Sequence, residues 1–258
     1  MRPTAYALAA LCLIAAPVAG QTAADHIQMG KAVEDLDPQT GLKHYEIALQ
    51  LDSNNYEALW RASDAMVDVA KQTPDSVKSP GRDSMYAAAE LLARRAVAAD
   101  SNGAEGHFVL AQAVGRASLT KSKKERVKRA KEIRDEALRA IAIDPGHDGA
   151  YHVLGRWNAE IMRLSGMTRF FAKTFLGGAV FNEASWNNAQ KFMEKAVALN
   201  PNYIYHHLDL GEVYVDREQW PAARAQLQQV ESLPVTDAMD PTYKAAATAL
   251  LAKIANKQ

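Results

Sequence analysis

The feature that most constrains this chain is an internal repeat. Segments around Ala96, Ala140 and Ala196 share one pattern: an aliphatic stretch that ends in Ala, four spacer residues, a Ser or Pro, a short polar turn and a new helix. An earlier copy surrounds Ala48. Units repeated in this way stack on their neighbours, because none of them can bury its apolar face alone. The chain is therefore expected to be a solenoid.

Small residues recur at one position of the helix that follows each turn. The eighth residue of these helices is Ser63, Ala111, Gly155 or Gly211. Small side chains let two helices approach closely, and the Pro or polar turn ends the second helix of each pair. This is the tetratricopeptide pattern. We expect an all-α, right-handed tetratricopeptide-repeat superhelix of antiparallel helix pairs with a C-terminal capping helix.

About five repeats fill a domain over residues 25–258. The expected pairs are 25–36 with 38–52, 56–72 with 83–100, 104–118 with 121–143, 148–164 with 184–199, and 204–217 with 220–232. A capping helix over 240–256 starts at Asp240-Pro241, a capping residue followed by a first-turn proline. Extra length lies in a Pro/Ser/Gly loop, 73–83, and in an insert, 165–183, that does not read as plain loop.

Residues 1–24 have the order of a secretory signal peptide. Arg2 precedes an apolar run from Ala5 to Ala16, and small residues follow. Cleavage can follow Gly20 or Ala24. The apolar run is short for a membrane span, and no later run is long enough for one. We expect an exported protein, periplasmic or secreted.

Composition excludes several functions. The one cysteine, Cys12, lies in the leader, so the mature chain has no disulfide, thiol nucleophile or thiolate metal site. The seven histidines have no metal-ligand spacing, and we expect no metal and no cofactor. Balanced charge gives no global field for nucleic acid. Nucleophile, phosphate-loop and dinucleotide motifs are absent, so the chain is not expected to be an enzyme.

Three stretches resemble one family more closely. They are Tyr151–Trp157, which contains Gly-Arg-Trp, Phe175–Gly178, and the Asn-Pro-aromatic turn within Ala196–His207. Together they resemble the regulator of microtubule dynamics family, over roughly Tyr151 to Lys253. The resemblance implies a tetratricopeptide fold. One branch of that family binds and moves phospholipids, so the resemblance makes a phospholipid one candidate partner. A secreted chain would not meet tubulin. We therefore take only the fold, and no partner, as predicted by the resemblance.

The first helix of each pair is expected to face a concave groove with its second, fifth, ninth and thirteenth residues. Aromatic and arginine side chains in such a surface suit recognition of a protein or peptide, because they combine contact area with directional donors. For Trp60 and Phe108, packing between repeats is an equal alternative. The candidate binding residues are Trp60, Asp64, Phe108, Gln112, His152, Arg156, Tyr205 and Glu212.

The insert places Phe170, Phe171 and Phe175 on one helical face. Each Phe left in water would forgo roughly 1.5–3 kcal/mol of burial, so a cover is expected. We expect first that this helix folds back onto the solenoid as core, second that it forms a lid over an apolar ligand, and third that it contacts a membrane surface. The leading function is a protein- or peptide-binding scaffold; the alternative is lipid or apolar-ligand binding or transfer in the groove under the insert.

A basic run extends from Lys121 to Arg134, with eight Lys or Arg residues against two Glu. Most of it is expected to be a solvated helix face with ion pairs at one-turn spacing. A phosphate or anionic-lipid site is the alternative.

Overall fold

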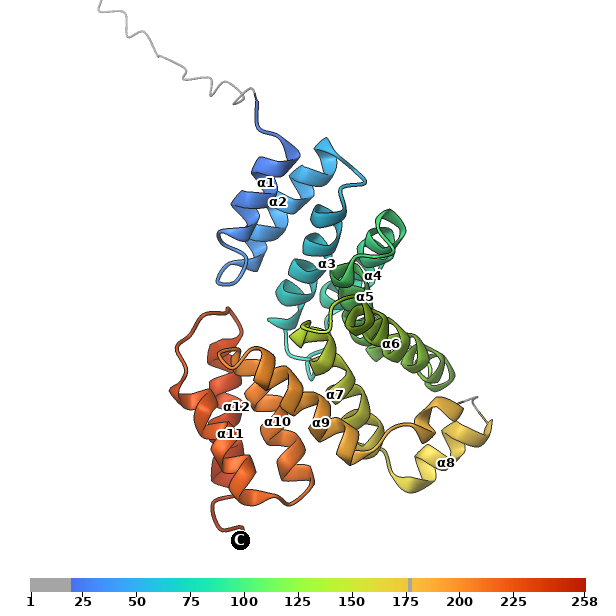
Figure 1. Ribbon diagram of the computed structural model, residues 1–258, viewed down its shortest axis with the longest axis vertical. Coiled ribbons are helices and arrows are strands. Elements are labelled where there is room, and N and C mark those ends of the chain that lie inside the picture. Colours follow the sequence, from blue (N-terminus) through green and yellow to red (C-terminus); the bar gives the residue numbers. More distant parts are fainter. Residues whose placement is uncertain (1–19, 176–177) are drawn as a thin grey trace, which may run out of the picture.

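The computed structural model describes residues 20–175 and 178–258, and this part of the chain is helical without strands (Figure 1). The predicted signal peptide lies almost entirely outside the described residues. The helices are α1 (Ala23–Lys31), α2 (Pro38–Leu51), α3 (Tyr56–Lys71), α4 (Pro80–Ala99), α5 (Ala104–Ala117), α6 (Lys123–Ile143), α7 (Asp148–Arg163), α8 (Gly166–Phe175), α9 (Trp186–Leu199), α10 (Ile204–Asp216), α11 (Trp220–Ser232) and α12 (Asp240–Lys253). Two short 3₁₀ helices, η1 (Ser118–Thr120) and η2 (Ala179–Asn182), complete the set.

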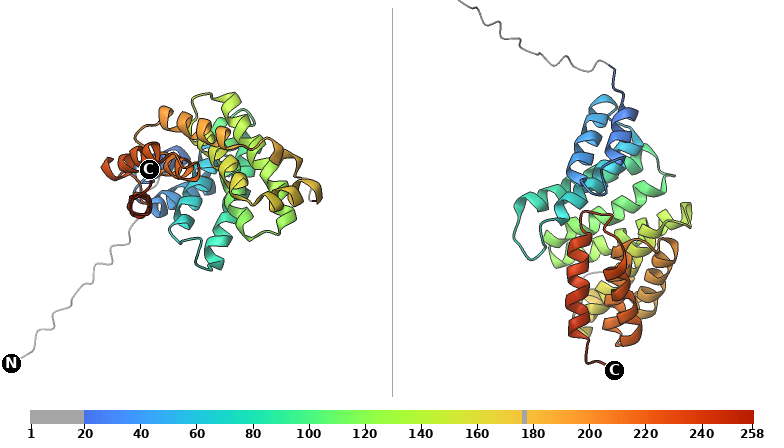
Figure 2. Two further views of the ribbon diagram at one scale, coloured as in Figure 1. Left: turned by 90° about the horizontal axis from the view of Figure 1, so that it is seen from below. Right: turned by 90° about the vertical axis from the view of Figure 1, so that its left-hand side faces the viewer.

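The helices pack as the repeat pattern predicts. Pairs form between α1 and α2, α3 and α4, α5 and α6, α7 and α9, and α10 and α11. The first helices of successive pairs contact one another, and α12 packs on α10 and α11 (Figures 1 and 2). The expected all-α tetratricopeptide superhelix with a capping helix is confirmed.

The small residues mark the closest helix approaches. A Cβ at Gly155 would lie 2.6 Å from Cγ of Met193, and one at Gly211 would lie 2.8 Å from Cδ2 of Leu227. In the second repeat the hydroxyl of Ser63 donates to a carbonyl of the facing helix, that of Ala89, at 2.9 Å. Larger side chains would push the paired helices apart, which explains the repeated small residue.

The two Asp-Pro sequences behave differently. Asp37 caps α2, since its side chain accepts from the backbone N–H of Thr40 at 3.0 Å. Asp240 does not cap α12 as expected. Its carboxylate instead accepts from the backbone N–H groups of Thr236 and Asp237, at 2.8 and 2.9 Å. Asp240 therefore stabilises the loop before the helix.

The Pro/Ser/Gly loop after α3 is held by one arginine. Arg82 is buried, and its Nη1 donates to the carbonyls of Pro74 and Val77 at 2.6 and 2.9 Å. Ser79 caps α4, which begins at Pro80, before the expected start at residue 83.

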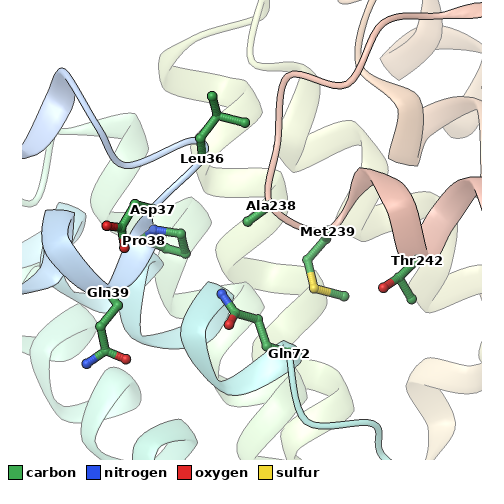
Figure 3. Close-up of a pocket in the computed structure, with 8 residues that line it drawn as sticks. All are labelled: Leu36, Asp37, Pro38, Gln39, Gln72, Ala238, Met239 and Thr242. Atoms are coloured by element: carbon green, nitrogen blue, oxygen red, sulfur yellow. The ribbon is translucent and has the colours of Figure 1, made fainter.

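The two ends of the superhelix meet. The backbone N–H of Ala238, in the loop before α12, donates to the carbonyl of Asp35, in the turn after α1, at 2.8 Å. A pocket of about 380 Å³ lies at this junction, and Figure 3 shows its walls on both sides. It is lined by Leu36, Asp37, Pro38, Gln39, Gln72, Ala238, Met239 and Thr242. The concave surface is thus closed into a ring at this point.

Candidate functional site

A second pocket lies on the concave side, where the C-terminal ends of α3 and α5 meet α4, α7, α10 and α12. Its volume is about 210 Å³. Cationic and aromatic side chains dominate the walls, as expected for a recognition surface. The lining residues are Lys71, Asp75, Tyr86, Arg116, Arg156, Tyr205, Met239 and Tyr243. Three residues at predicted groove positions, Arg116, Arg156 and Tyr205, are among them.

Arg156 is the centre of the polar contacts in this region. Its Nη1 donates to the hydroxyl of Tyr205 and to Oδ2 of Asp209, the latter at 3.0 Å. The Tyr205 ring stacks on Tyr243 with 4.4 Å between centroids, so α7, α10 and α12 are joined. Asp209 is buried. Burial opposes its ionisation, but Arg156 and His152 hold the pKa of Asp209 well below its usual range.

His152 belongs to a chain of four side chains, of which three are buried and Asp148 is half-buried. Its Nδ1 lies 2.8 Å from Nδ1 of His206, and its Nε2 lies 3.0 Å from Oδ2 of Asp209. Nε2 of His206 lies 2.9 Å from Asp148. Burial lowers the pKa of His152 to about 4, although Asp209 opposes the shift.

Glu212 lies beside this chain and contacts Arg163. Nη2 of Arg163 lies 3.2 Å from Glu212 and 2.8 Å from Asp216. Burial, with the negative charge of Asp209 second, raises the pKa of Glu212 to about 7. Its carboxyl group therefore changes charge near neutral pH.

Asp64 lies half-buried on α3, about two turns before Lys71 of the pocket. Burial and the carboxylate of Asp68 raise the pKa of Asp64 well above its usual value. Asp68 pairs with Lys71, whose Nζ is 2.6 Å away and 5.7 Å from the centre of the Tyr205 ring. The side chain of Lys71 is only 8% exposed. This cation of the second repeat therefore lies inside the closed superhelix, beside Tyr205 of the fifth repeat.

Trp60 and Phe108 pack between repeats, which was the alternative to a role in the groove. Both are half-buried against the apolar core between α3, α4 and α5. The Phe108 ring also lies 4.6 Å from that of His147 in the next repeat. Gln112 is half-buried, and its Oε1 is buried without a hydrogen-bond partner among the described residues.

Six residues of this site were not predicted: Lys71, Asp75, Tyr86, Asp209, Met239 and Tyr243. Lys71 and Tyr243 come together through the closure of the ring, for which the repeat pattern carries no signal. Asp209 is the sixth residue of α10 and falls outside the four groove positions. Its place could have been found from helical spacing, since it lies one turn after Tyr205 on the same face.

The insert does not fold back as expected. On α8 the exposed fractions are 83% for Met167, 65% for Phe170 and 53% for Phe171. Among the described side chains of this helix, only Ala172 lies in the buried cluster that also contains Phe181 of η2. The expectation that Phe170 and Phe171 become core is wrong, because the small Ala172 and the 3₁₀ segment fill the available space. The side chain of Phe175 lies outside the description.

The insert does not lie over the concave pocket. Among the described residues, α8 supplies no side chain to its lining. Figures 1 and 2 show α8 projecting on the far side of α7 from α12. The cluster beneath it contains Val127 of α6 and Trp157 of α7, so the insert extends the outer surface.

The basic run on α6 is partly neutralised by neighbouring helices. Arg129 donates to Glu90 of α4 at 2.7 Å, and Arg134 forms an ion pair with Glu183, which follows η2. Lys131 pairs with Asp135 one turn later. These contacts fit the expected solvated, ion-paired helix face.

Within residues 20–175 and 178–258, no helix has the length and apolarity needed to cross a membrane. In the same part of the chain, no group of three or more His, Cys, Asp or Glu side chains is arranged to hold a metal ion.

The fold and groove define a tetratricopeptide-repeat solenoid, and solved structures agree. A thermophilic tetratricopeptide-repeat protein of Thermus thermophilus superposes with a TM-score of 0.63 at 16% identity, covering 88% of this chain and 100% of that chain. The pilF protein of Pseudomonas aeruginosa superposes with a TM-score of 0.50 at 14% identity, covering 90% and 91%. At these identities the likeness shows the fold alone.

The family is shown by sequence. The model of regulator of microtubule dynamics protein 1-3 matches residues 22–255, and the chain belongs to this family. Regulator of microtubule dynamics protein 1 of Bos taurus is 24% identical over 217 residues, which cover 83% of this chain and 67% of that protein. The suspected resemblance is confirmed. It extends further than expected, since the match includes the N-terminal half.

Proposed function

We propose that this protein is a non-enzymatic scaffold that binds a protein or peptide partner on the concave side of its superhelix, outside the cytoplasm. The observation that carries the proposal is the convergence of cationic and aromatic side chains from six helices on one pocket. Membership of the family and the tetratricopeptide fold support a scaffold, because such repeats present extended concave binding surfaces.

The polarity of the pocket favours a peptide over an acyl chain. Lys71, Arg116 and Arg156 line it together with tyrosines. An acyl chain placed against these groups would remove water from charges without replacing its hydrogen bonds, which is costly. A peptide supplies backbone carbonyls and polar side chains that accept from the same donors.

Partner capture tests the binding role. A photo-crosslinking residue at Gln72, exposed at the mouth of the junction pocket, is compared with one at Arg126, exposed on the outer helix α6. In cells that express the chain, the proposal predicts a discrete crosslinked partner from position 72 and none from position 126. Equal crosslinking from both positions, or from neither, would contradict a groove-binding scaffold.

Export rests on the leader sequence. The start of α1 supports cleavage after Gly20 over cleavage after Ala24, because the side chain of Thr22 accepts from the backbone N–H of Asp25 while the Asp25 carboxylate accepts from the Thr22 backbone N–H. Cleavage after Ala24 would remove this cap. N-terminal sequencing of protein from the extracytoplasmic fraction is expected to give a mature chain that begins with Gln21. Uncleaved protein in the cytoplasm would contradict export.

One observation favours the second candidate, an apolar or lipid ligand. Met167 and Phe170 present apolar surface on α8. In this reading the insert contacts a lipid surface at a distance from the concave pocket. Flotation with liposomes, and lipid analysis of the purified protein, decide between the two. The scaffold proposal predicts no flotation and no co-purified lipid, and a Phe170→Ser variant that captures its partner as the wild type does.

A further inference from the structure

The concave pocket of about 210 Å³ gathers positive charge. Three cations line it, Lys71 from α3, Arg116 from α5 and Arg156 from α7, against one lining carboxylate, Asp75. The electrostatic interaction between Arg116 and Arg156 is repulsive. Like charges held close together in a half-buried site cost free energy unless an anion lies between them.

Hydrogen-bond donors in this pocket exceed the acceptors. An arginine offers five N–H donors and a lysine three. Among the described residues, Arg116 makes one hydrogen bond, from Nη1 to Oδ2 of Asp75 at 3.3 Å. Asp75 is shared, because its other carboxylate oxygen lies 3.8 Å from Arg82, and its side chain is 49% exposed. Several guanidinium donors are therefore available to a ligand.

Tyr86 adds a neutral donor that is buried and unsatisfied. Its residue is 1% exposed, its ring packs in the core between α4 and α5, and it lines the pocket. Its hydroxyl has no hydrogen-bond partner in the part of the chain described. Leaving a buried hydroxyl without an acceptor is unfavourable, and a ligand oxygen in the pocket would supply one.

We propose that this pocket is a carboxylate-binding subsite of the concave groove, in which Arg116, Arg156 and Tyr86 donate to one carboxylate of the bound peptide. The stacked rings of Tyr205 and Tyr243 form an aromatic wall for the carbon atoms next to it. The inference rests on the proposed peptide-binding function and names the group that the groove recognises.

Charge and size select a carboxylate. Asp68, Asp75 and Asp209 each pair with one of the three cations, so the pocket has little surplus positive charge and suits a monoanion better than a phosphate dianion. Planar guanidinium groups match the two oxygens of a carboxylate. A volume of about 210 Å³ holds a carboxylate with a short carbon chain, since one water occupies about 30 Å³. Either an acidic side chain or the C-terminus of the peptide fits this description.

Four small probes separate these sources. N-acetylglutamic acid α-amide carries only the side-chain carboxylate, N-acetylglutamine only the terminal one, N-acetylglutamine amide neither, and inorganic phosphate tests the dianion. Each is titrated into the full mature chain with ¹⁵N-labelled arginine, and the Nε–H signals are followed by NMR. We expect one of the two carboxylates to shift the Arg116 and Arg156 signals saturably, with a Kd on the order of 1 mM, typical of a small fragment.

The neutral amide is expected to produce no saturable shift, and phosphate a weaker response than the better carboxylate. Whichever carboxylate probe binds identifies the group recognised, an acidic side chain or the C-terminus of the peptide. Equal shifts with the neutral amide, tighter binding of phosphate, or no saturable shift with either carboxylate would overturn the assignment.

Matched variants assign the donors. Arg116→Gln removes one lining cation and should weaken the better probe about 10–100-fold, the range for a charge-assisted hydrogen bond. Arg126→Gln makes the same change at an exposed position of α6 and should not alter binding. Tyr86→Phe removes only the unsatisfied hydroxyl. It should weaken binding of the better probe about 2–10-fold without lowering the unfolding midpoint. A purely structural tyrosine would instead leave probe binding unchanged. Unchanged binding in both pocket variants would overturn the proposal.

Failure of the subsite and failure of the peptide-binding function give different results. A partner captured from position 72 that the better probe does not displace would leave the scaffold function standing and refute the subsite. Saturable probe binding without any captured partner would support the subsite and refute the peptide partner.

Discussion

The concave pocket and the insert helix α8 differ in which kinds of side chain they bury. In the groove, charged side chains are drawn inward and paired, as Arg156 is with the buried Asp209. On α8, apolar side chains are directed outward, with Phe170 65% exposed. Burial of a charge is tolerated where partners satisfy it, and exposure of a Phe is tolerated where smaller residues already fill the core. The pocket is thus built by electrostatics, and the insert is held by a few apolar contacts.

The largest effect is expected from the buried carboxylate of the groove. Asp209→Asn leaves Arg156 and His152 without their charged partner and should lower the free energy of unfolding by about 3–5 kcal/mol, as for one partner of a buried ion pair. Urea unfolding measures the loss. Asp216→Asn, where the side chain is 31% exposed, is the control and should cost no more than about 1 kcal/mol. Equal losses would mean that the pocket gains nothing from the burial of Asp209.

The insert offers its own matched pair. Phe181 of η2 is 5% exposed, so Phe181→Ala should cost about 3–5 kcal/mol of stability. Phe170→Ala on α8 should change stability by no more than about 0.5 kcal/mol. Both are measured by denaturant unfolding. A large loss at Phe170 would indicate that α8 packs more tightly than its exposure indicates.

The smallest effect is a pH dependence at the edge of the groove. Burial raises the pKa of Glu212 to about 7 from 4.5. The native state therefore binds a proton that the unfolded state has released between these values, and the contribution of Glu212 to stability is complete below 4.5 and lost as the pH rises through about 7.

Glu212→Gln should remove this dependence. The variant should match the wild type near pH 4 and exceed its stability near pH 8 by about 1 kcal/mol, a figure reduced because the side chain is 38% exposed. Thermal unfolding across this pH range is the measurement. A variant less stable at high pH would show that the ion pair with Arg163 outweighs burial.

Local sequence signals predicted most of the fold. The small residues Gly155 and Gly211, and the cap at Asp37, act where their spacing places them, because helix packing and capping depend on residues a few positions apart. The closure of the ring could not be predicted. It depends on the curvature accumulated over all repeats, which brings Lys71 to Tyr205 and Ala238 to Asp35.

The candidate site shows the same limit. Arg156 and Tyr205 were predicted from their positions in single helices, and both line the pocket. The position of Tyr243 in the pocket could not be predicted, because α12 lies outside the repeats and has no groove-facing position defined by them. For α8 the count of Phe residues favoured a cover, but the sequence does not show that Ala172 and Phe181 already fill the contact with α6 and α7.

Hydrogen–deuterium exchange of the mature chain, with and without the partner captured from position 72, tests the central claim most directly. The proposed groove scaffold predicts slower exchange at the C-terminal ends of α3 and α5 and at the start of α12, with α8 unchanged. Protection confined to Gly166–Phe175, with no change around Lys71 and Tyr243, would contradict it and place recognition on the insert.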